Sequence, residues 1–218
     1  HVTSTTTMRQ VHFTYNGDYN ILKKYFQHIN PQLIANAKPI TKNMEKRGGG
    51  ILDIKLIDKT TSIANYYQLH ATFETLDAMG ANFINSCLES FANTFKTEAT
   101  YFDGIKDSDI DIVMSILSNY VPECLVRAEV SCKVEELNED PNVSSEDFAH
   151  KFIQAVQIAE VEPYRAVTHN KGIMNGIDAV VLATGNDFRA VEAGVHAYAS
   201  RNGSYSSLTQ AKVENGIF

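Results

Sequence analysis

The sequence lacks tryptophan, has three cysteines and five prolines among 218 residues, and contains no long apolar run. The odd cysteine count without CxxC spacing excludes a disulfide framework and a zinc ribbon, and favours a reducing compartment, the cytoplasm. A membrane span needs about 18 consecutive apolar residues, so an integral membrane protein is not expected. Acidic residues outnumber basic residues and give a net charge of −7, which argues against nucleic acid as the partner.

The remaining composition, 44% hydrophobic and 21% charged, is that of a globular protein. Several segments alternate apolar and polar residues with the period of a half-buried β-strand. These predicted strands lie within residues 11–15, 52–56, 67–73, 110–116 and 126–134.

Helical spacing of apolar residues occupies the stretches between the first strands. Asp18 is predicted to cap a helical region over 18–46, which Pro31 and Pro39 divide into two pieces. Asp77 is predicted to cap a second long helix. Its apolar stripe consists of Ile84, Leu88, Phe91 and Phe95.

This order, β-α-β-β-α-β with one further strand, predicts an α+β fold with a ferredoxin-like, split βαβ domain. Right-handed crossovers would place its helices on one face of an antiparallel sheet. A polar, turn-rich stretch at 138–147 predicts a boundary, which gives domains over 6–137 and 143–218. The second domain is predicted to be mainly helical.

Within that second domain, Pro163 is predicted to begin a helix that Gly172 and Gly176 interrupt. Lys171 lies between small and apolar neighbours, where a partly buried ammonium would stabilise an oxyanion. Asp187 opens the next helix and would keep this lysine charged and in position. Each residue alone also has a simpler interpretation, a lysine that extends to solvent and an N-cap aspartate.

No HExxH, GxSxG, P-loop or GxGxxG motif is present, and metal ligation has no support. Residues 77–82 lie at a predicted strand-to-helix junction, where free backbone N–H groups suit a pyrophosphate. An ordinary N-cap is the simpler interpretation. The three glycines at 48–50 either allow a phosphate to approach the backbone or end a helix in a turn. Arg165 either grips a carboxylate or forms a surface ion pair.

These segments resemble class II (bacterial-type) 3-hydroxy-3-methylglutaryl-CoA reductases. The similar runs appear in the family's order from about residue 48 to about residue 208, whereas residues 1–47 match only in their pattern of elements. The runs are 48–50, 77–82, 116–119, 168–176, 185–187, 189–194, 196–199 and 203–205.

The resemblance implies reduction of 3-hydroxy-3-methylglutaryl-CoA to mevalonate and CoA by two hydride transfers from NAD(P)H. It implies that Lys171 stabilises the oxyanion, that Asp187 tunes it, that Arg165 binds the substrate carboxylate and that Asn175 supports them. It also implies a homodimer with active sites at the subunit boundary. The cofactor residues it implies on the ferredoxin-like domain are Asp77, Ala78, Met79, Gly80, Asn82, Asn85 and Asn119.

An acidic residue at the end of the first helical region would favour the free ribose 2′-hydroxyl of NAD(H). The corresponding position, seven before the glycines, is Thr41, and basic residues lie near it. We therefore expect NADP(H) rather than NAD(H). The nearby basic residues are Lys42, Lys46 and Arg47.

The resemblance leaves the family's catalytic glutamate before His1 and its flap histidine after Phe218. We therefore expect a piece of a longer protein, which alone binds cofactor weakly and does not turn over. The alternative is a non-catalytic ferredoxin-like binding or assembly module, which would not need Lys171 beside Asp187. RNA binding on the sheet face would need exposed aromatic residues, whereas Tyr67 and Phe73 alternate as core residues do.

Overall fold

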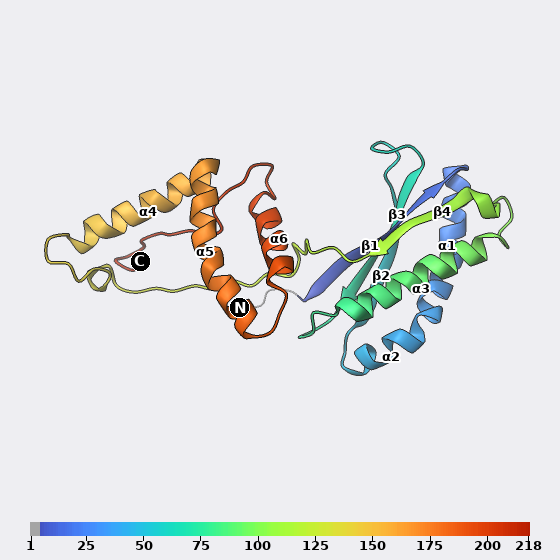
Figure 1. The fold of residues 1–218 in the computed structure, drawn as a ribbon, viewed down its shortest axis with the longest axis horizontal. Coiled ribbons are helices and arrows are strands. Elements are labelled where there is room, and N and C mark those ends of the chain that lie inside the picture. The colour runs from blue at the N-terminus through green and yellow to red at the C-terminus, as the bar shows by residue number, and fades with distance from the viewer. Residues whose placement is uncertain (1–4) are drawn as a thin grey trace. The chain divides into compact units, whose positions relative to one another are not determined.

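A computed structural model describes residues 5–218, which divide into two compact units (Figure 1). The first unit extends to Val126, and the second comprises Arg127–Phe218. The division precedes the turn-rich stretch at 138–147. The reason is that Cys132 and Phe218 exchange two backbone hydrogen bonds, of 3.1 and 2.9 Å, which tie the segment after Val126 to the second unit.

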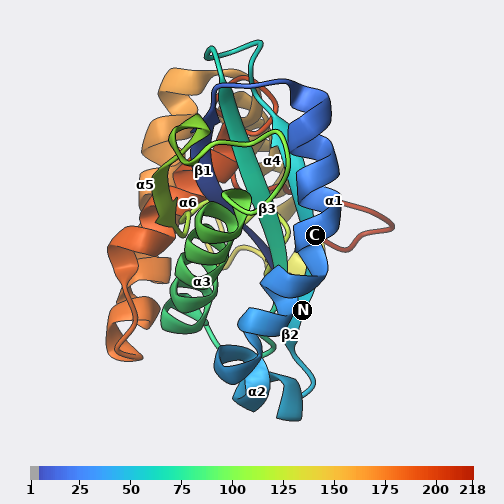
Figure 2. The same ribbon diagram turned by 90° about the vertical axis from the view of Figure 1, so that its right-hand side faces the viewer.

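The first unit is a four-stranded antiparallel sheet in the order β2-β3-β1-β4. Figure 2 shows α1 and α3 over one face of this sheet. The predicted α+β ferredoxin-like arrangement is therefore confirmed. The elements are β1 (Thr6–Tyr15), α1 (Tyr19–Asn36), α2 (Lys38–Lys46), β2 (Gly50–Asp58), β3 (Tyr66–Glu74), α3 (Ala81–Ala99), the 3-10 turn η1 (Asp107–Asp109) and β4 (Ile110–Ile116).

The predicted alternation of β1 places every second side chain against the helices. There they meet the buried stripes of α1 and α3 in one hydrophobic core. Asp18 caps α1 as predicted, since its carboxylate accepts the N–H of Asn20 at 2.7 Å. Two helical pieces are present, with the break at Ala37; Pro31 stays inside α1 and Pro39 lies in the first turn of α2.

The predicted strand at 126–134 is wrong. Val126 and Val130 are 79% and 89% exposed, and of this segment only residues 132–134 bond to residues 216–218. Alternating polarity permits a strand, but a strand also needs a partner edge for its backbone groups. Among the described residues, this segment has isolated bridge positions at Val126 and Lys133 but no continuous ladder.

The predicted start of α3 at Asp77 is also wrong. The helix begins at Ala81, and its N-cap is Gly80 in the left-handed conformation, with φ 71°. The chain first makes a turn in which the N–H of Ala78 donates to the carbonyl of Thr75 at 3.0 Å. A glycine is the residue that adopts positive φ without strain, so the helix starts where the glycine is.

The second unit is helical, as predicted. After the 3-10 turn η2 (Val134–Glu136), it contains α4 (Ser145–Val161), α5 (Pro163–Ala183) and α6 (Phe188–Ala199). Pro163 begins α5 as predicted, but Gly172 and Gly176 do not interrupt it. A helical glycine costs only about 1 kcal/mol relative to alanine, and α5 offsets this by burying Ala166, Asn170 and Met174.

On the helix-free face of the sheet, four polar side chains of β1 and β3 form a hydrogen-bonded row. Tyr66 Oη lies 2.5 Å from His12 Nδ1, Gln68 Nε2 also bonds this hydroxyl, and His70 Nε2 lies 2.5 Å from Gln68 Oε1. Burial lowers the pKa of His12. Burial, Lys59 and His12 together lower the pKa of His70.

Because both histidines have lowered pKa values, the folded state favours their neutral forms. The stability they contribute is complete above the unfolded pKa of about 6.5 and is lost as pH falls through this value toward the lower folded pKa. We expect the thermal unfolding midpoint of the first unit to decrease when the pH is lowered from 7 to 5. Replacing His12 and His70 by glutamine should make this midpoint less dependent on pH. His150→Gln, at an exposed position of α4, is the control and should leave the dependence unchanged. An unchanged pH dependence in the double variant would contradict the assignment of this effect to His12 and His70.

Replacing Gly80 or Gly172 by alanine should change stability in opposite directions. A Cβ on Gly80 would lie 2.7 Å from Thr75 Cγ2 at positive φ, so Gly80→Ala should destabilise the first unit by about 1–2 kcal/mol. A Cβ on Gly172 meets nothing within 4 Å, so Gly172→Ala should stabilise the second unit by about 0.5–1 kcal/mol. Thermal unfolding of the two variants tests both signs; destabilisation by Gly172→Ala would mean that α5 is not continuous.

Candidate functional site

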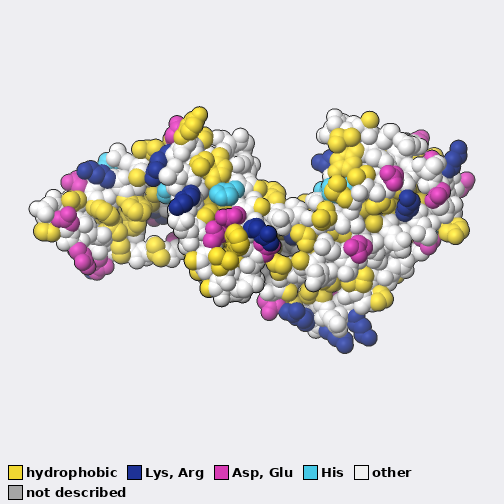
Figure 3. All heavy atoms as spheres, in the orientation of Figure 1, with side chains coloured by type: hydrophobic (Ala, Val, Ile, Leu, Met, Phe, Trp, Pro, Cys, Tyr) yellow, Lys and Arg dark blue, Asp and Glu magenta, His cyan; other side chains and the backbone are white. Residues whose placement is uncertain are grey.

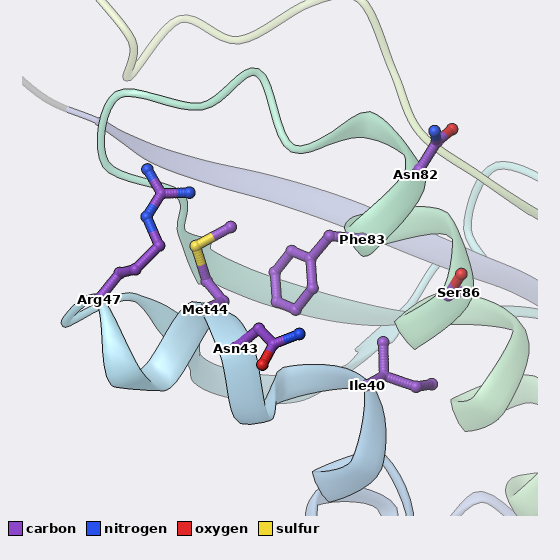
Figure 4. A pocket seen from close by; sticks show the side chains of 7 residues that line it. All are labelled: Ile40, Asn43, Met44, Arg47, Asn82, Phe83 and Ser86. Carbon is purple, nitrogen blue, oxygen red and sulfur yellow. The ribbon is translucent and has the colours of Figure 1, made fainter.

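A cavity of about 310 Å³ lies between α2 and α3 (Figure 4). Its apolar part comes from Ile40, Met44 and Phe83, and its polar groups stand around them. Such a mixture suits a flat ring that carries polar substituents. The full lining is Ile40, Asn43, Met44 and Arg47 with Asn82, Phe83 and Ser86.

The N-terminus of α3 borders this cavity through Asn82 and Phe83. Gly80 provides no side-chain cap, and the first turn of α3 holds no acidic residue. Backbone N–H groups at a helix N-terminus and the positive end of the helix dipole attract anions. A side chain at Gly80 would collide with Thr75, so the local geometry favours glycine as the residue before this end of the helix.

Arg47, the residue that ends α2, forms an ion pair with Asp77. Their side chains are 50% and 82% exposed, so water screens the pair and it contributes little stability. Figure 3 shows basic side chains gathered over α2, which carries Lys38, Lys42 and Lys46. Asp77 therefore holds Arg47 at the rim of the cavity instead of capping α3.

The other residues expected around the cofactor lie in the turn before α3, in the first turns of α3 and in the loop after β4. Ala78 and Met79 lie in the turn before α3, and Met79 is 69% exposed. Asn82 lines the cavity, whereas the Asn85 side chain accepts the N–H of Leu117 at 3.1 Å. Asn85 thus fastens the loop after β4, in which Asn119 is exposed.

The glycines at 48–50 serve the connection between α2 and β2. Gly48 and Gly50 have φ values of 96° and 127°, and a Cβ on Gly49 would lie 2.5 Å from the carbonyl oxygen of Glu74. The turn is closed by the N–H of Gly49, which donates to Met44 at 3.0 Å. Their helix-ending role accounts for all three residues.

Thr41 does not line the cavity. It is buried, and its hydroxyl donates to Glu45 Oε1 at 2.6 Å, while Lys38 bonds the other oxygen of that carboxylate at 2.6 Å. These hydrogen bonds from Lys38 and Thr41 lower the pKa of Glu45. Sequence reasoning missed Asn43 and Ser86, although both follow cavity residues at helical spacing, three after Ile40 and four after Asn82.

In the second unit, Lys171 is exposed rather than partly buried. Its apolar neighbours in sequence do not surround it, because Met174 turns toward the buried side of α5. Asp187 caps α6, where its carboxylate accepts the N–H groups of Arg189 and Ala190 at 3.1 and 3.3 Å. No hydrogen bond or ion pair joins Lys171 to Asp187 in the described part of the chain.

The reason is the length of α5. Asp187 lines a shallow cavity of about 450 Å³ together with Leu182, near the end of that helix. Leu182 is eleven positions after Lys171 in the same continuous helix, a rise of about 16 Å, which is longer than a lysine side chain. The expected contact between Lys171 and Asp187 is therefore absent within one chain.

Arg165 and Asn175 are exposed on α5, and Asn175 lies one turn after Lys171. Arg165 makes no ion pair among residues 5–218. Glu162, an acidic residue three positions before it, instead caps α5 by accepting the N–H of Tyr164 at 3.1 Å. The structure thus leaves the guanidinium of Arg165 and the ammonium of Lys171 exposed on the same helix.

Among the described residues, no three His, Cys, Asp or Glu side chains are arranged to hold a metal ion. No helix in that part of the chain has the length and apolar character needed to cross a membrane. Burial raises the pKa of the Cys87 thiol to about 12 and also raises that of Cys124. Both thiols are thus poor nucleophiles.

Comparison with known proteins finds the same family throughout. The sequence profile for hydroxymethylglutaryl-coenzyme A reductase matches residues 1–217. A probable 3-hydroxy-3-methylglutaryl-coenzyme A reductase of Borreliella burgdorferi is 35% identical over 192 residues, which cover 87% of this chain and 41% of the relative. The 3-hydroxy-3-methylglutaryl-coenzyme A reductase of Archaeoglobus fulgidus is 33% identical over 183 residues, which cover 84% of this chain and 38% of the relative.

Solved structures agree. A Streptococcus pneumoniae 3-hydroxy-3-methylglutaryl-coenzyme A reductase matches 98% of this chain and 48% of its own, with a TM-score of 0.77 and 31% identity. The class II enzyme of that organism, bound to NADPH in open conformations, matches 95% of this chain and 53% of its own, with a TM-score of 0.75 and 31% identity. The chain thus spans about two fifths of the curated relatives' length. On the profile match over almost its whole length, the chain belongs to the hydroxymethylglutaryl-coenzyme A reductase family.

Proposed function

We propose that the protein containing this chain reduces 3-hydroxy-3-methylglutaryl-CoA to mevalonate and CoA with NADPH. Family membership supports the reaction, and the relative bound to NADPH supports a nicotinamide cofactor. The structural observation that carries the proposal is the cavity between α2 and α3, with Arg47 at its rim and the uncapped N-terminus of α3 beside it. This arrangement offers separate places for a ring and for phosphates.

In this proposal the adenine ring occupies the apolar part of the cavity, between Ile40, Met44 and Phe83. Arg47 binds the 2′-phosphate, since a guanidinium matches phosphate oxygens with paired donors. The N–H groups of α3 bind the pyrophosphate, because Gly80 leaves them accessible. The bound cofactor supplies hydride. The remaining residues of the proposed cofactor site are Asp77, Ala78, Met79, Asn82, Asn85 and Asn119.

On α5, Lys171 donates a hydrogen bond to the substrate carbonyl oxygen as negative charge develops on it. Arg165 binds the substrate carboxylate in bidentate geometry, and Asn175, one turn after Lys171, helps to orient the reacting carbonyl. All three side chains are exposed in the single chain. A surface with two cations and an amide suits an anionic substrate, but it needs a cover that excludes water.

A second copy of the protein would provide that cover. Since α5 keeps Lys171 about 16 Å from the Asp187 end of the same chain, the carboxylate that positions this lysine comes from another subunit. Asp187 then keeps the lysine charged between the two carbonyl reductions. Each active site contains Lys171 of one subunit and Asp187 of the other, so the homodimer is the catalytic unit.

Complementation between inactive variants tests this composite site. Lys171→Met and Asp187→Asn should each lower kcat of the complete protein by about a hundredfold or more, because each removes charge stabilisation in the transition state. Co-expression of the two with different tags should restore about a quarter of wild-type activity, since half of random dimers carry one intact site. Lys151→Met, on exposed α4, is the control. No restoration would mean that both residues act within one chain.

Cofactor choice gives a second test. Arg47→Gln in the complete protein should raise KM for NADPH about tenfold and leave KM for NADH nearly unchanged, since only NADPH carries the 2′-phosphate. Lys42→Gln is the matched control, because Lys42 is exposed on α2 but does not line the cavity. Equal losses for both cofactors would assign Arg47 to the pyrophosphate instead, and a wild-type preference for NADH would refute the choice of NADPH.

A further inference from the structure

Arg9 is a buried guanidinium that the proposed site has not used. It lies on the helix-facing side of β1 and is only 6% exposed. Its Nη1 donates to the carbonyl of Met8 at 2.7 Å, whereas its Nε is buried without a partner. Burial lowers the pKa of this guanidinium, and Cys124 and Glu123 oppose that effect.

The strand register places Arg9 beneath the first turns of α3. On one side, Thr7 pairs with Phe73, whose ring meets that of Phe83 in α3 edge-on at 5.9 Å. On the other side, Gln10 pairs with Ile116, the residue before Leu117. The N–H of Leu117 donates to Asn85, also in the first turns of α3, so contacts on both sides of Arg9 lead to the same end of this helix.

Two positive features therefore lie close together, and neither has a carboxylate in direct contact with it among the described residues. The first turn of α3 has no acidic residue and no side-chain cap. Among the described residues, Arg9 forms no ion pair. Glu123 is the carboxylate whose charge acts on it, but it is exposed and lies beyond ion-pair distance. A buried charge is costly unless it is paired, so this end of the first unit is electrostatically prepared for an anionic group from outside.

We propose that Arg9 supplies the buried positive charge that holds an anionic group of a bound ligand, a phosphate or a carboxylate, at the N-terminus of α3. Because Arg9 lies beneath the helix, it acts as a positioning residue that strengthens the field of the exposed N–H groups. The inference rests on the proposed function for the identity of the ligands. The shared chemistry is the anionic oxygen, which either the cofactor phosphates or the substrate can provide.

Binding to the complete protein separates the two sources. Arg9→Met should raise Kd for NADPH or for the CoA thioester about tenfold, and Arg9→Lys should restore most of the affinity because it keeps the charge. The loss should shrink as salt concentration rises, since ions screen the missing attraction. Thr7→Val is the matched control: its hydroxyl is also buried and unpartnered, so the variant should bind normally and be at least as stable.

A loss confined to NADPH assigns the anionic group to the cofactor, and a loss confined to the thioester assigns it to the substrate. Unchanged affinity for both ligands in a folded Arg9→Met variant would overturn the inference while leaving the proposed function intact. If Arg9→Met does not fold, Glu123→Gln, at an exposed position, provides the test. This variant removes a carboxylate that competes for Arg9, so it should bind the same ligand two- to threefold more tightly. Unchanged or weaker binding would overturn the inference. Wild-type protein that binds neither ligand would instead refute the proposed function.

Discussion

The uninterrupted course of α5 is the constraint on which the proposed chemistry depends. Each helical residue adds a fixed rise of about 1.5 Å, and most of the fifteen residues between Lys171 and Asp187 are helical. The two side chains therefore cannot come into contact within one chain. Gly172 and Gly176 do not relieve this constraint, since both are helical and their surroundings leave the backbone regular. Under the proposed function, this separation requires Lys171 and Asp187 of one active site to come from two subunits.

The proposed function sets the first unit a different physical problem, because a chain with a net charge of −7 would have to attract a polyanionic cofactor. This unit holds three positive features: Arg47 at the end of α2, the uncapped N-terminus of α3, and buried Arg9, which we infer to lie beneath that helix end. Local fields, rather than net charge, decide where an anion binds, because salt screens distant exposed charges. Asp77 fits this view as the residue that holds Arg47 in place.

The parts of the fold that depend on local periodicity were predictable from the sequence. The alternation of β1 and the stripe from Ile84 to Phe95 became the core because one face of each element is buried. The failures have other causes: among the described residues the 126–134 segment forms isolated bridges instead of a continuous ladder, and Gly80 rather than Asp77 starts α3 because of its left-handed backbone conformation. The apolar sequence neighbours of Lys171 also led to the wrong prediction that this lysine is partly buried, since adjacent residues of a helix point in different directions.

The measurement that tests this account most directly is a crystal structure of the complete protein with both ligands bound. The distance to determine is that between Nζ of Lys171 and the carboxylate oxygens of Asp187, within each subunit and across the dimer. The account predicts hydrogen-bond distance across the boundary, with α5 still continuous. A contact within one subunit, or a Lys171 amine in bulk solvent away from both carboxylates, would contradict it.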